Sequence, residues 1–356
     1  MVVKRRIKKW VIFLMFLVVL LIGCGITIMY LSSPVDKNDK ETVEVVVESG
    51  SSSTQIGHLL KEKDLIRNEL LFKVYLNFYN VGALKASTYK LNKSMDLMEV
   101  IKSLEAGNSY NPDEIKITFK EGQRITDYAK EIADNTNNNY EDVIKAFEDR
   151  EYVKTLMSSY WFLTDSILDS SIYYPLEGYL APDTYHFKNK DVSLDDIIKT
   201  MLNEMEKKLE KYKGVISKDV HYYMTMASII ELEGTNTENR KMIAGVFENR
   251  LNSGMNLGSD VTTYYGLQAA MTSDLTTEQF ASSNGYNTRG ANMIGKMPIG
   301  PICSPSESSI EAASNPTDSD YLFFVADKNG NIYYTKTNKE HEAKVAEIKA
   351  NGDWIW

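Results

Sequence analysis

Residues 10–31 (WVIFLMFLVVLLIGCGITIMYL) form a run of 22 residues without a single charge. As an α-helix with a rise of about 1.5 Å per residue, this run is roughly 33 Å long, enough to cross a hydrocarbon core of about 30 Å. Residues 1–9 carry five cations and no anion. Because basic flanks stay in the cytoplasm, the sequence predicts a cytoplasmic tail (1–9), a single-pass transmembrane helix (10–31) and an extracytoplasmic remainder.

Two other export signals compete with this interpretation. A cleaved secretory signal has a shorter apolar region and a small-residue cleavage site, and this run is too long for one. The stretch Leu21-Ile22-Gly23-Cys24 fits the box at which bacterial lipoproteins are cut and acylated. Apolar sequence continues after Cys24 as far as Leu31, which a mature lipoprotein would not need. The uncleaved anchor is therefore favoured over the lipoprotein.

The part of the chain beyond the anchor is acidic. Five of the 40 Lys and Arg residues lie in the basic tail, which leaves 35 against 49 Asp and Glu, a net charge of −14. Such a surface argues against nucleic acid as a partner and is compatible with an uncharged or zwitterionic polymer or with a protein. Of the two cysteines, Cys24 lies in the predicted membrane segment and Cys303 far downstream, so no disulfide is expected.

Strand-like and helical patterns are mixed through the rest of the chain, which predicts an α+β fold. After a polar linker (32–42), a β-like run at 43–47 precedes a turn at Gly50 and a helical pattern, and the same unit recurs around Gly122. We divide the sequence into a membrane-proximal α+β module (43–110) and a second α+β domain (111–356). The other predicted elements are helices at 65–76, 97–104, 140–158, 194–212 and 339–350, a strand at 88–91, and a hairpin at 321–337.

Residues 221–234 (HYYMTMASIIELEG) combine an apolar helical pattern with two glutamates. Apolar positions 222, 226, 229 and 230 mark one helical face, and extending that face reaches Glu233 but not Glu231. A carboxyl group in partly apolar surroundings has a raised pKa, and the carbonyl dipoles of a helix C-terminus add to the effect. A general acid needs a proton held near neutral pH, so Glu233 is the candidate catalytic residue. Gly234 is the predicted C′ residue.

On spacing alone, simpler explanations stay open for the acidic residues of this region. Glu233 could emerge into water at the helix end or pair with Arg240. Glu231 is more often a surface charge at such a position, and Asp260 more often a hydrogen-bond acceptor in a loop.

The segments that follow this helix are rich in hydroxyl, amide and aromatic side chains. Residues 235–238 (TNTE) are typical of a capped start of a second helix, which Gly254 ends. Residues 255–267 are a predicted loop, and residues 285–288 and 298–306 are rigid and largely uncharged. Such side chains around one buried acid are suited to holding a carbohydrate.

Other chemistries lack their characteristic residues. The four histidines are scattered, and the sequence has no HExxH pair and no Cys/His cluster, so neither a metal nor another cofactor is predicted. There is no GxSxG elbow and no P-loop. Residues 87–90 (STYK) match SxxK formally, but the pattern is short and common by chance, and no Lys-Thr-Gly partner follows.

A series of motifs occurs in a fixed order along residues 177–327. They are EGYLAPDTY (177–185), MASIIELE (226–233), IAGVFENRL (243–251), GMNLGSD (254–260), YNT (286–288), GPI (300–302) and YLFFVAD (321–327). Together they closely resemble the YceG/MltG-type endolytic murein transglycosylases. The resemblance implies a LysM-like membrane-proximal module before an extracytoplasmic catalytic domain that cuts nascent peptidoglycan strands internally. It maps the essential acid of the family onto Glu233.

The resemblance also implies a mechanism. Lytic transglycosylases as a class need one carboxyl group, which protonates the MurNAc–GlcNAc glycosidic oxygen and then takes the proton of the muramyl 6-hydroxyl, leaving a 1,6-anhydro end. No cofactor is required, and penicillin-binding proteins are the expected partners. The predicted substrate-binding residues are Tyr179, Asp183, Glu231, Ser259, Asp260, Thr262, Tyr286 and Asn287.

Three positions depart from the pattern of the family. Gly258 stands where the family usually has Gln, Val261 where it has Pro, and Ala181 where it has Phe. The loss of an amide side chain and of a large aromatic ring would remove substrate contacts. Two alternatives therefore stay open, a wall-binding or divisome scaffold with a degenerate cleft, and a hydrolytic muramidase whose products would carry reducing ends.

Overall fold

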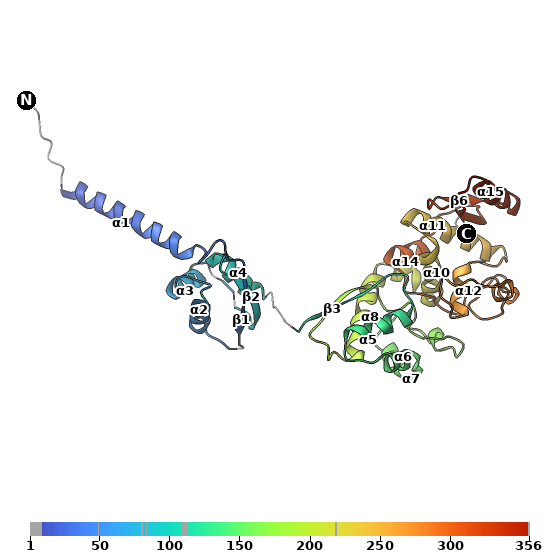
Figure 1. The fold of residues 1–356 in the computed structure, drawn as a ribbon, viewed down its shortest axis with the longest axis horizontal. Coiled ribbons are helices and arrows are strands. Elements are labelled where there is room, and N and C mark those ends of the chain that lie inside the picture. Colours follow the sequence, from blue (N-terminus) through green and yellow to red (C-terminus); the bar gives the residue numbers. More distant parts are fainter. Residues whose placement is uncertain are drawn as a thin grey trace, which may run out of the picture. The chain divides into compact units, whose positions relative to one another are not determined.

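The computed structural model describes residues 9–48, 50–79, 81–82, 84–107, 113–217 and 219–354. It divides into two compact units, Met1–Asp113 and Glu114–Trp356, and each is described by itself (Figure 1). Both units mix helices and strands, so the predicted α+β class is confirmed. The predicted boundary between residues 110 and 111, and all of the basic tail except Lys9, lie outside the described residues.

The first unit begins with one long apolar helix, α1 (Lys9–Ser32). Within the described residues it is the one helix long and apolar enough to cross a membrane, over Leu14–Ser32, and no part of that window is buried in the protein. These properties are consistent with the predicted single-pass anchor.

A small α+β module follows α1 in the first unit. Its elements are β1 (Thr42–Val47), α2 (Ser53–Glu62), α3 (Glu69–Phe78), β2 (Ser87–Asn92) and α4 (Leu97–Ala106). The strands pair antiparallel, with Val45 opposite Tyr89, and their inward side chains pack on Leu60, Phe72 and Val100. The helix predicted at 65–76 begins four residues later, because Leu65 and Ile66 are buried in the turn before it. The LysM-like assignment stays a prediction.

The second unit opens with a strand pair that encloses three helices. β3 (Ile115–Phe119) pairs antiparallel with β4 (Asp183–Phe187), and the segment between them holds α5 (Ile125–Asn135), α6 (Tyr140–Glu148), α7 (Arg150–Met157) and the 3₁₀ turn η1 (Asp165–Leu168). One helix was predicted for 140–158. The structure has two, because Asp149 ends α6 and its carboxylate caps α7, accepting from the amides of Glu151 at 2.9 Å and Tyr152 at 3.1 Å.

The rest of the second unit is mainly helical. Its elements are α8 (Leu194–Glu210), α9 (Lys213–Ile216), α10 (Val220–Glu233), α11 (Thr237–Asn252), α12 (Asp260–Gly266), α13 (Thr277–Phe280), η2 (Ala291–Met293), α14 (Glu307–Ser314), β5 (Phe323–Ala326), β6 (Ile332–Thr335) and α15 (Asn338–Ala350). The predicted terminal hairpin is confirmed by the antiparallel pairing of β5 and β6. The predicted loop at 255–267 is partly wrong, because its second half forms α12.

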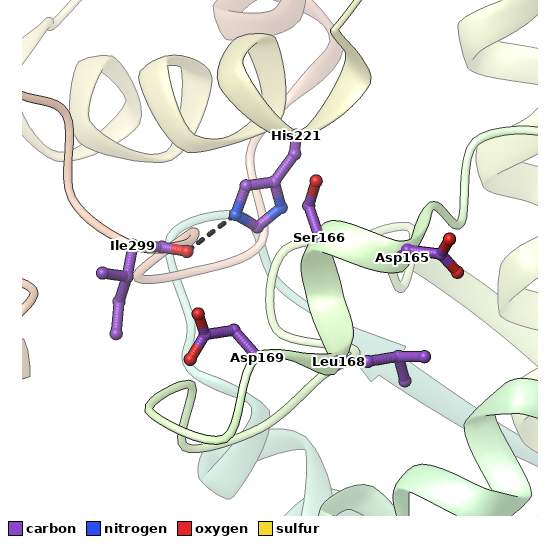
Figure 2. A pocket seen from close by; sticks show the side chains of 6 residues that line it. All are labelled: Asp165, Ser166, Leu168, Asp169, His221 and Ile299. Atoms are coloured by element: carbon purple, nitrogen blue, oxygen red, sulfur yellow. Dashed lines mark hydrogen bonds between the residues drawn. The ribbon is translucent and has the colours of Figure 1, made fainter.

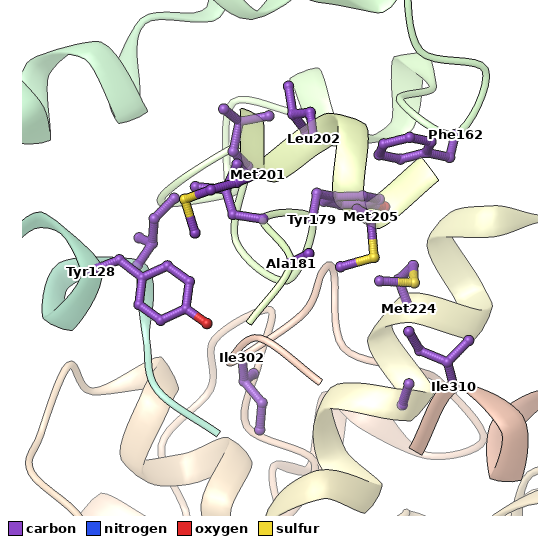
Figure 3. Packing of buried hydrophobic residues seen from close by; sticks show 14 of the residues in the cluster. Tyr128, Phe162, Tyr179, Ala181, Met201, Leu202, Met205, Met224, Ile302 and Ile310 are labelled. Atoms are coloured by element: carbon purple, nitrogen blue, oxygen red, sulfur yellow. The ribbon is translucent and has the colours of Figure 1, made fainter. Parts of the chain in front are cut away.

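The helix α10 lies at the centre of this unit and packs against α11, α12 and α14 (Figure 1). Its residues from Met224 to Ile230 are all buried, polar Thr225 and Ser228 included. The prediction of one apolar face was therefore wrong, since neighbours cover the helix on every side. The core beside it gathers Tyr179, Met205 and Met224 around Ala181 (Figure 3).

Gly245 allows the backbone of residue 317 to lie against α11. A Cβ atom at Gly245 would lie 2.2 Å from the carbonyl oxygen of Thr317, whose amide donates to the carbonyl of Lys241 at 3.0 Å. Gly214 in α9 offers a comparison, because a Cβ there meets no atom within 4 Å.

Replacing Gly245 with Ala is expected to destabilise the protein by about 2 kcal/mol or more, because overpacking outweighs the gain of about 1 kcal/mol in helix propensity. Gly214→Ala is expected to be neutral or slightly stabilising. Urea unfolding of both variants measures the difference, and equal stabilities would contradict the close approach.

Candidate active site

Glu233 is the last residue of α10, and the chain leaves the helix in an extended conformation. Gly234 follows it as the C-cap residue, with φ −101° and ψ 133°, so the prediction that it is the C′ residue was wrong. A glycine is required for another reason, since a Cβ atom at this position would lie 2.5 Å from Cγ of Arg240. Close packing of α11 against the end of α10 therefore sets the direction in which the chain leaves Glu233.

The carboxyl group of Glu233 is partly buried and held by one hydrogen bond. Its Oε1 accepts from Oγ of Ser259 at 2.6 Å, and within the described part of the chain this is its only hydrogen bond. Burial raises the pKa of Glu233 and the negative charge of Asp260 raises it further, against the effects of Ser259 and Arg289. The raised pKa means that this carboxyl group holds a proton more tightly than an ordinary glutamate does.

Two hydroxyl groups, those of Thr262 and Thr288, fix the position of Ser259 at the start of α12. The amide of Ser259 donates to Oγ1 of Thr288 at 3.0 Å, and Oγ1 of Thr262 donates to the carbonyl of Ser259 at 2.6 Å. Thr262 and Thr288 also lie within hydrogen-bond distance of each other, at 2.8 Å. The structure thus brings predicted Ser259 and Thr262 to Glu233. Thr288 belongs to the YNT motif (286–288) but is not among the predicted substrate-binding residues.

Tyr286 and Asn287 contact α12, the helix that begins after Ser259. Asn287 is fully buried, accepts from Oγ1 of Thr263 at 2.6 Å and donates to the carbonyl of Ser282 at 2.6 Å. The ring of Tyr286, also buried, packs edge-on against Tyr265 with centroids 4.7 Å apart. Both residues were predicted to bind substrate; in this structure both are buried behind Ser259 and Thr262.

Asp260 is the exposed acid of the site. About half of its side chain is exposed, and its carboxylate forms an ion pair with Arg289, which is similarly exposed. Because both side chains reach solvent next to Ser259, they are accessible to a ligand that approaches Glu233.

Glu231 is nearly buried and joins three helices. Its Oε1 accepts from Arg240 of α11 at 2.8 Å, while Oε2 accepts from the amide of Ser306 at 2.8 Å and from Oγ of Ser309 at 2.7 Å. Ser306 caps α14, and an anion is stabilised at a helix N-terminus. With its side chain only 7% exposed, Glu231 is not a surface charge, and Arg240 pairs with it and not with Glu233.

Two more polar groups of α10 hold the segment 299–306. Nε2 of His221 donates to the carbonyl of Ile299 at 2.7 Å, and the amide of Ile302 donates to Oγ of Ser228 at 3.0 Å. Together with Glu231, they form a row of polar side chains along a buried helix. Sequence reasoning missed this row because the surrounding apolar residues dominate the helical pattern.

Tyr179 and Asp183 lie apart from the hydrogen-bonded group around Glu233. Tyr179 is fully buried, and its hydroxyl donates to Nδ1 of His221 at 2.9 Å. Asp183 begins β4 and lies 3.5 Å from Nζ of Lys208. A substrate contact by the Tyr179 ring would require its exposure, so in this structure the residue serves packing.

A separate pocket lies near the other end of α10. It is lined by Asp165, Ser166, Leu168, Asp169, His221 and Ile299, and Figure 2 shows His221 directed at the carbonyl of Ile299. His221 precedes Glu233 by twelve residues, or roughly 18 Å along the helix axis. This pocket therefore does not contain the candidate acid.

Glu177 is a buried carboxyl group that sequence reasoning did not select, although it begins one of the quoted motifs. Its Oε1 accepts from the amide of Ile125 at 3.0 Å, and its Oε2 accepts from the hydroxyl of Tyr265 at 3.0 Å. It thereby joins the start of α5 to α12, the helix that begins after Ser259. Burial raises the pKa of Glu177 to about 8, against these two hydrogen bonds.

Residues 45–347 match the model of the YceG-like family. The chain belongs to this family. An endolytic murein transglycosylase of Bacillus subtilis (strain 168) is 38% identical over 332 residues, which cover 91% of this chain and 89% of that protein. A relative of the same name from Streptococcus pneumoniae serotype 2 (strain D39) is 35% identical over 96% of this chain, which spans 65% of its length. A crystal structure of a YceG-like protein from Listeria monocytogenes is 37% identical with a TM-score of 0.61, covering 86% of this chain and 99% of that one.

The YceG-like match includes elements of both units, since it begins in β1 and ends in α15. Among the residues that the structure describes, no group of three or more His, Cys, Asp or Glu side chains is placed to hold a metal ion. The expectation that the protein works without a cofactor stays a prediction.

The buried Glu177 predicts how the stability of this YceG-like protein depends on pH. Its pKa is raised on folding, so its favourable contribution is present below pH 4.5 and is lost as the pH rises toward about 8. The slope is about 1.4 kcal/mol per pH unit in this window, or roughly 5 kcal/mol in total. Thermal unfolding of Glu177→Gln from pH 5 to pH 9 is expected to lack this part of the pH dependence.

The exposed Glu141 supplies the control, because Glu141→Gln makes the same chemical change at the surface. Its unfolding curve is expected to run parallel to that of the parent protein. A parallel curve for Glu177→Gln as well would show that Glu177 does not titrate as described.

Proposed function

We propose that this chain is a membrane-anchored lytic transglycosylase that cuts the MurNAc–GlcNAc bond within nascent peptidoglycan strands. Its relatives from Bacillus subtilis and Streptococcus pneumoniae are named endolytic murein transglycosylases. The observation that carries the proposal is the partly buried carboxyl of Glu233, with a raised pKa and one oxygen held by Ser259. The apolar helix α1 is consistent with the anchor.

In the first step, Glu233 acts as a general acid. Its protonated carboxyl donates the proton to the glycosidic oxygen while the bond from that oxygen to C1 of MurNAc breaks. The 2-acetamido group of the substrate supports the positive charge that develops at C1. A raised pKa favours this step because it keeps the carboxyl protonated at a pH where an ordinary glutamate is ionised.

In the second step, the same residue acts as a base. The carboxylate of Glu233 removes the proton of the muramyl 6-hydroxyl, whose oxygen then bonds to C1 and closes the 1,6-anhydro ring. The proton returns to Glu233, so the enzyme is regenerated and no water is consumed. The hydrogen bond from Ser259 stabilises the carboxylate between the two steps.

The neighbouring carboxylates are engaged in other contacts, which favours a mechanism with one acid. Glycosidases that use water or a covalent intermediate need a second carboxylate. Glu231 is bound to Arg240 and to the start of α14, and Asp260 is paired with Arg289. These contacts favour the transglycosylase over the hydrolytic muramidase.

The scaffold alternative was based on three departures from the family pattern, and the structure gives each of them a structural explanation. Ala181 is fully buried, and Val261 is only 7% exposed, so both departures from the family pattern change packing and not an exposed contact. Gly258 has a φ of +70°, a left-handed conformation that glycine adopts without strain. The turn that it makes leads directly to Ser259. Cooperation with penicillin-binding proteins remains an expectation from the family.

Glu233→Gln is expected to abolish cleavage of uncrosslinked peptidoglycan strands, because an amide cannot donate the proton. Mass spectrometry of the fragments tests this, since the parent protein should release glycans one water lighter than hydrolysis products. Ser253→Ala, at an exposed position after α11, is the control and should cleave normally. Fragments with reducing ends would contradict the transglycosylase, and normal cellular function of Glu233→Gln would favour the scaffold.

Ser259→Ala should shift the pH dependence of activity. The hydrogen bond from Ser259 lowers the pKa of Glu233, so its loss raises that pKa further. The alkaline limb of kcat/KM is therefore expected to move to higher pH, while the maximal rate falls about tenfold because the carboxyl is less well oriented. An alkaline limb that stays in place would show that another group controls it.

A further inference from the structure

The helix α3 of the first unit carries an exposed apolar stripe. Leu70, Val74 and Phe78 follow one another at intervals of four residues and are 70%, 50% and 78% exposed, and Tyr79 beside them is 53% exposed. The opposite face of α3 packs Phe72 into the core of the module. Large side chains exposed along one helical face indicate an interaction surface.

The start of α3 is fixed to the end of α1. Nη2 of Arg67 donates to the carbonyls of Pro34 at 2.6 Å and Val35 at 2.9 Å, and its guanidinium lies 4.6 Å from the centre of the Tyr30 ring. Leu70 follows Arg67 by three residues, less than one helical turn. The stripe therefore begins beside the last turn of α1.

The second half of α3 also faces the end of α1. Ser32, the last residue of α1, lines one pocket together with Tyr75 and Tyr79. Figure 1 likewise shows α3 beside the end of α1 that leads into the module. Because α1 is apolar from Leu14 to Ser32, its end corresponds to the boundary between hydrocarbon and headgroups.

The residues around the stripe are those that favour a membrane interface. Tyrosine rings and the long side chains of Lys and Arg are stable at the headgroup level, with apolar parts toward the hydrocarbon and polar ends in water. Around Leu70, one hollow gathers three cations and one acid: Lys61, Arg67, Lys73 and Glu69. The excess of positive charge complements anionic phospholipid headgroups.

We propose that the α3 stripe, Leu70, Val74 and Phe78 with Tyr79, docks into the outer leaflet of the bilayer that α1 crosses. The inference rests on the proposed membrane anchor. Its partner is a lipid surface, chosen because the stripe continues directly from the end of the membrane-spanning helix. The docked helix lies in the interface and adds a second contact, so the module is held at the membrane by more than a flexible tether.

The chain offers a matched control position for a test. Val46 on β1 is 52% exposed, against 50% for Val74, and belongs to the same unit. Its neighbours Val45 and Val47 point into the core that Phe72 closes, so Val46 lies on the opposite face of the strand. The two valines thus differ in location but not in type or exposure.

The experiment uses the full chain with Cys24→Ala, reconstituted in vesicles of phosphatidylethanolamine and phosphatidylglycerol. Cys303 is fully buried and can stay. A nitroxide spin label is attached at Val74→Cys or at Val46→Cys, and power saturation measures its collisions with oxygen, which concentrates in lipid, and with a water-soluble nickel chelate. The label at position 74 is expected to favour oxygen several-fold relative to the label at position 46.

Flotation of the vesicles separates failure of the anchor from failure of the docking surface. Protein that does not float with the vesicles would overturn both. Protein that floats, with equal nickel accessibility at positions 74 and 46, would overturn the docking alone. A label at position 74 shielded from both reagents would show that protein covers the stripe, either a second copy or another part of this chain, and would also overturn it. Phe78→Glu is expected to move the label at position 74 toward water, whereas Val46→Glu should leave that label in place.

Discussion

The hydrogen bonds made by the buried polar groups of α10 determine where the residues of the site lie. Glu231 alone joins α10 to α11 and to the start of α14, through Arg240, Ser306 and Ser309. A buried carboxylate without partners would cost several kcal/mol, so these contacts must form together with the fold. The end of α10 is thereby fixed, and the candidate acid two residues later inherits that position.

The two glutamates of one short motif therefore have different tasks because their surroundings differ. Glu231 accepts three hydrogen bonds, which satisfy a charged carboxylate, and its contacts are structural. Glu233 accepts one, from Ser259, while its burial raises its pKa. The first residue joins three helices, and the second has the raised pKa that suits a general acid. Such a division suits a site that must hold one acid in a fixed position.

Glu177 is a second buried carboxyl group that joins elements around the site. It links the start of α5 to Tyr265 in α12, and α12 begins immediately after Ser259. The carboxyl that supports the site is itself buried at a cost that increases with pH. The position of Ser259 and the stability of the second unit are therefore coupled through Glu177.

The sequence by itself determined the apolar anchor segment, the α+β class, most helices and strands, and Glu233 as the candidate acid, because hydrophobic periodicity and ordered motifs are local properties. The spacing of residues in the sequence does not specify which residues are in contact, and these contacts were decided by the tertiary structure. It buried α10 on all sides, paired Arg240 with Glu231, turned half of a predicted loop into α12 and placed Tyr179 in the core. Each of these four outcomes depends on contacts between residues distant in sequence. The packing of the helices determines which partner lies within hydrogen-bond distance of a buried polar group.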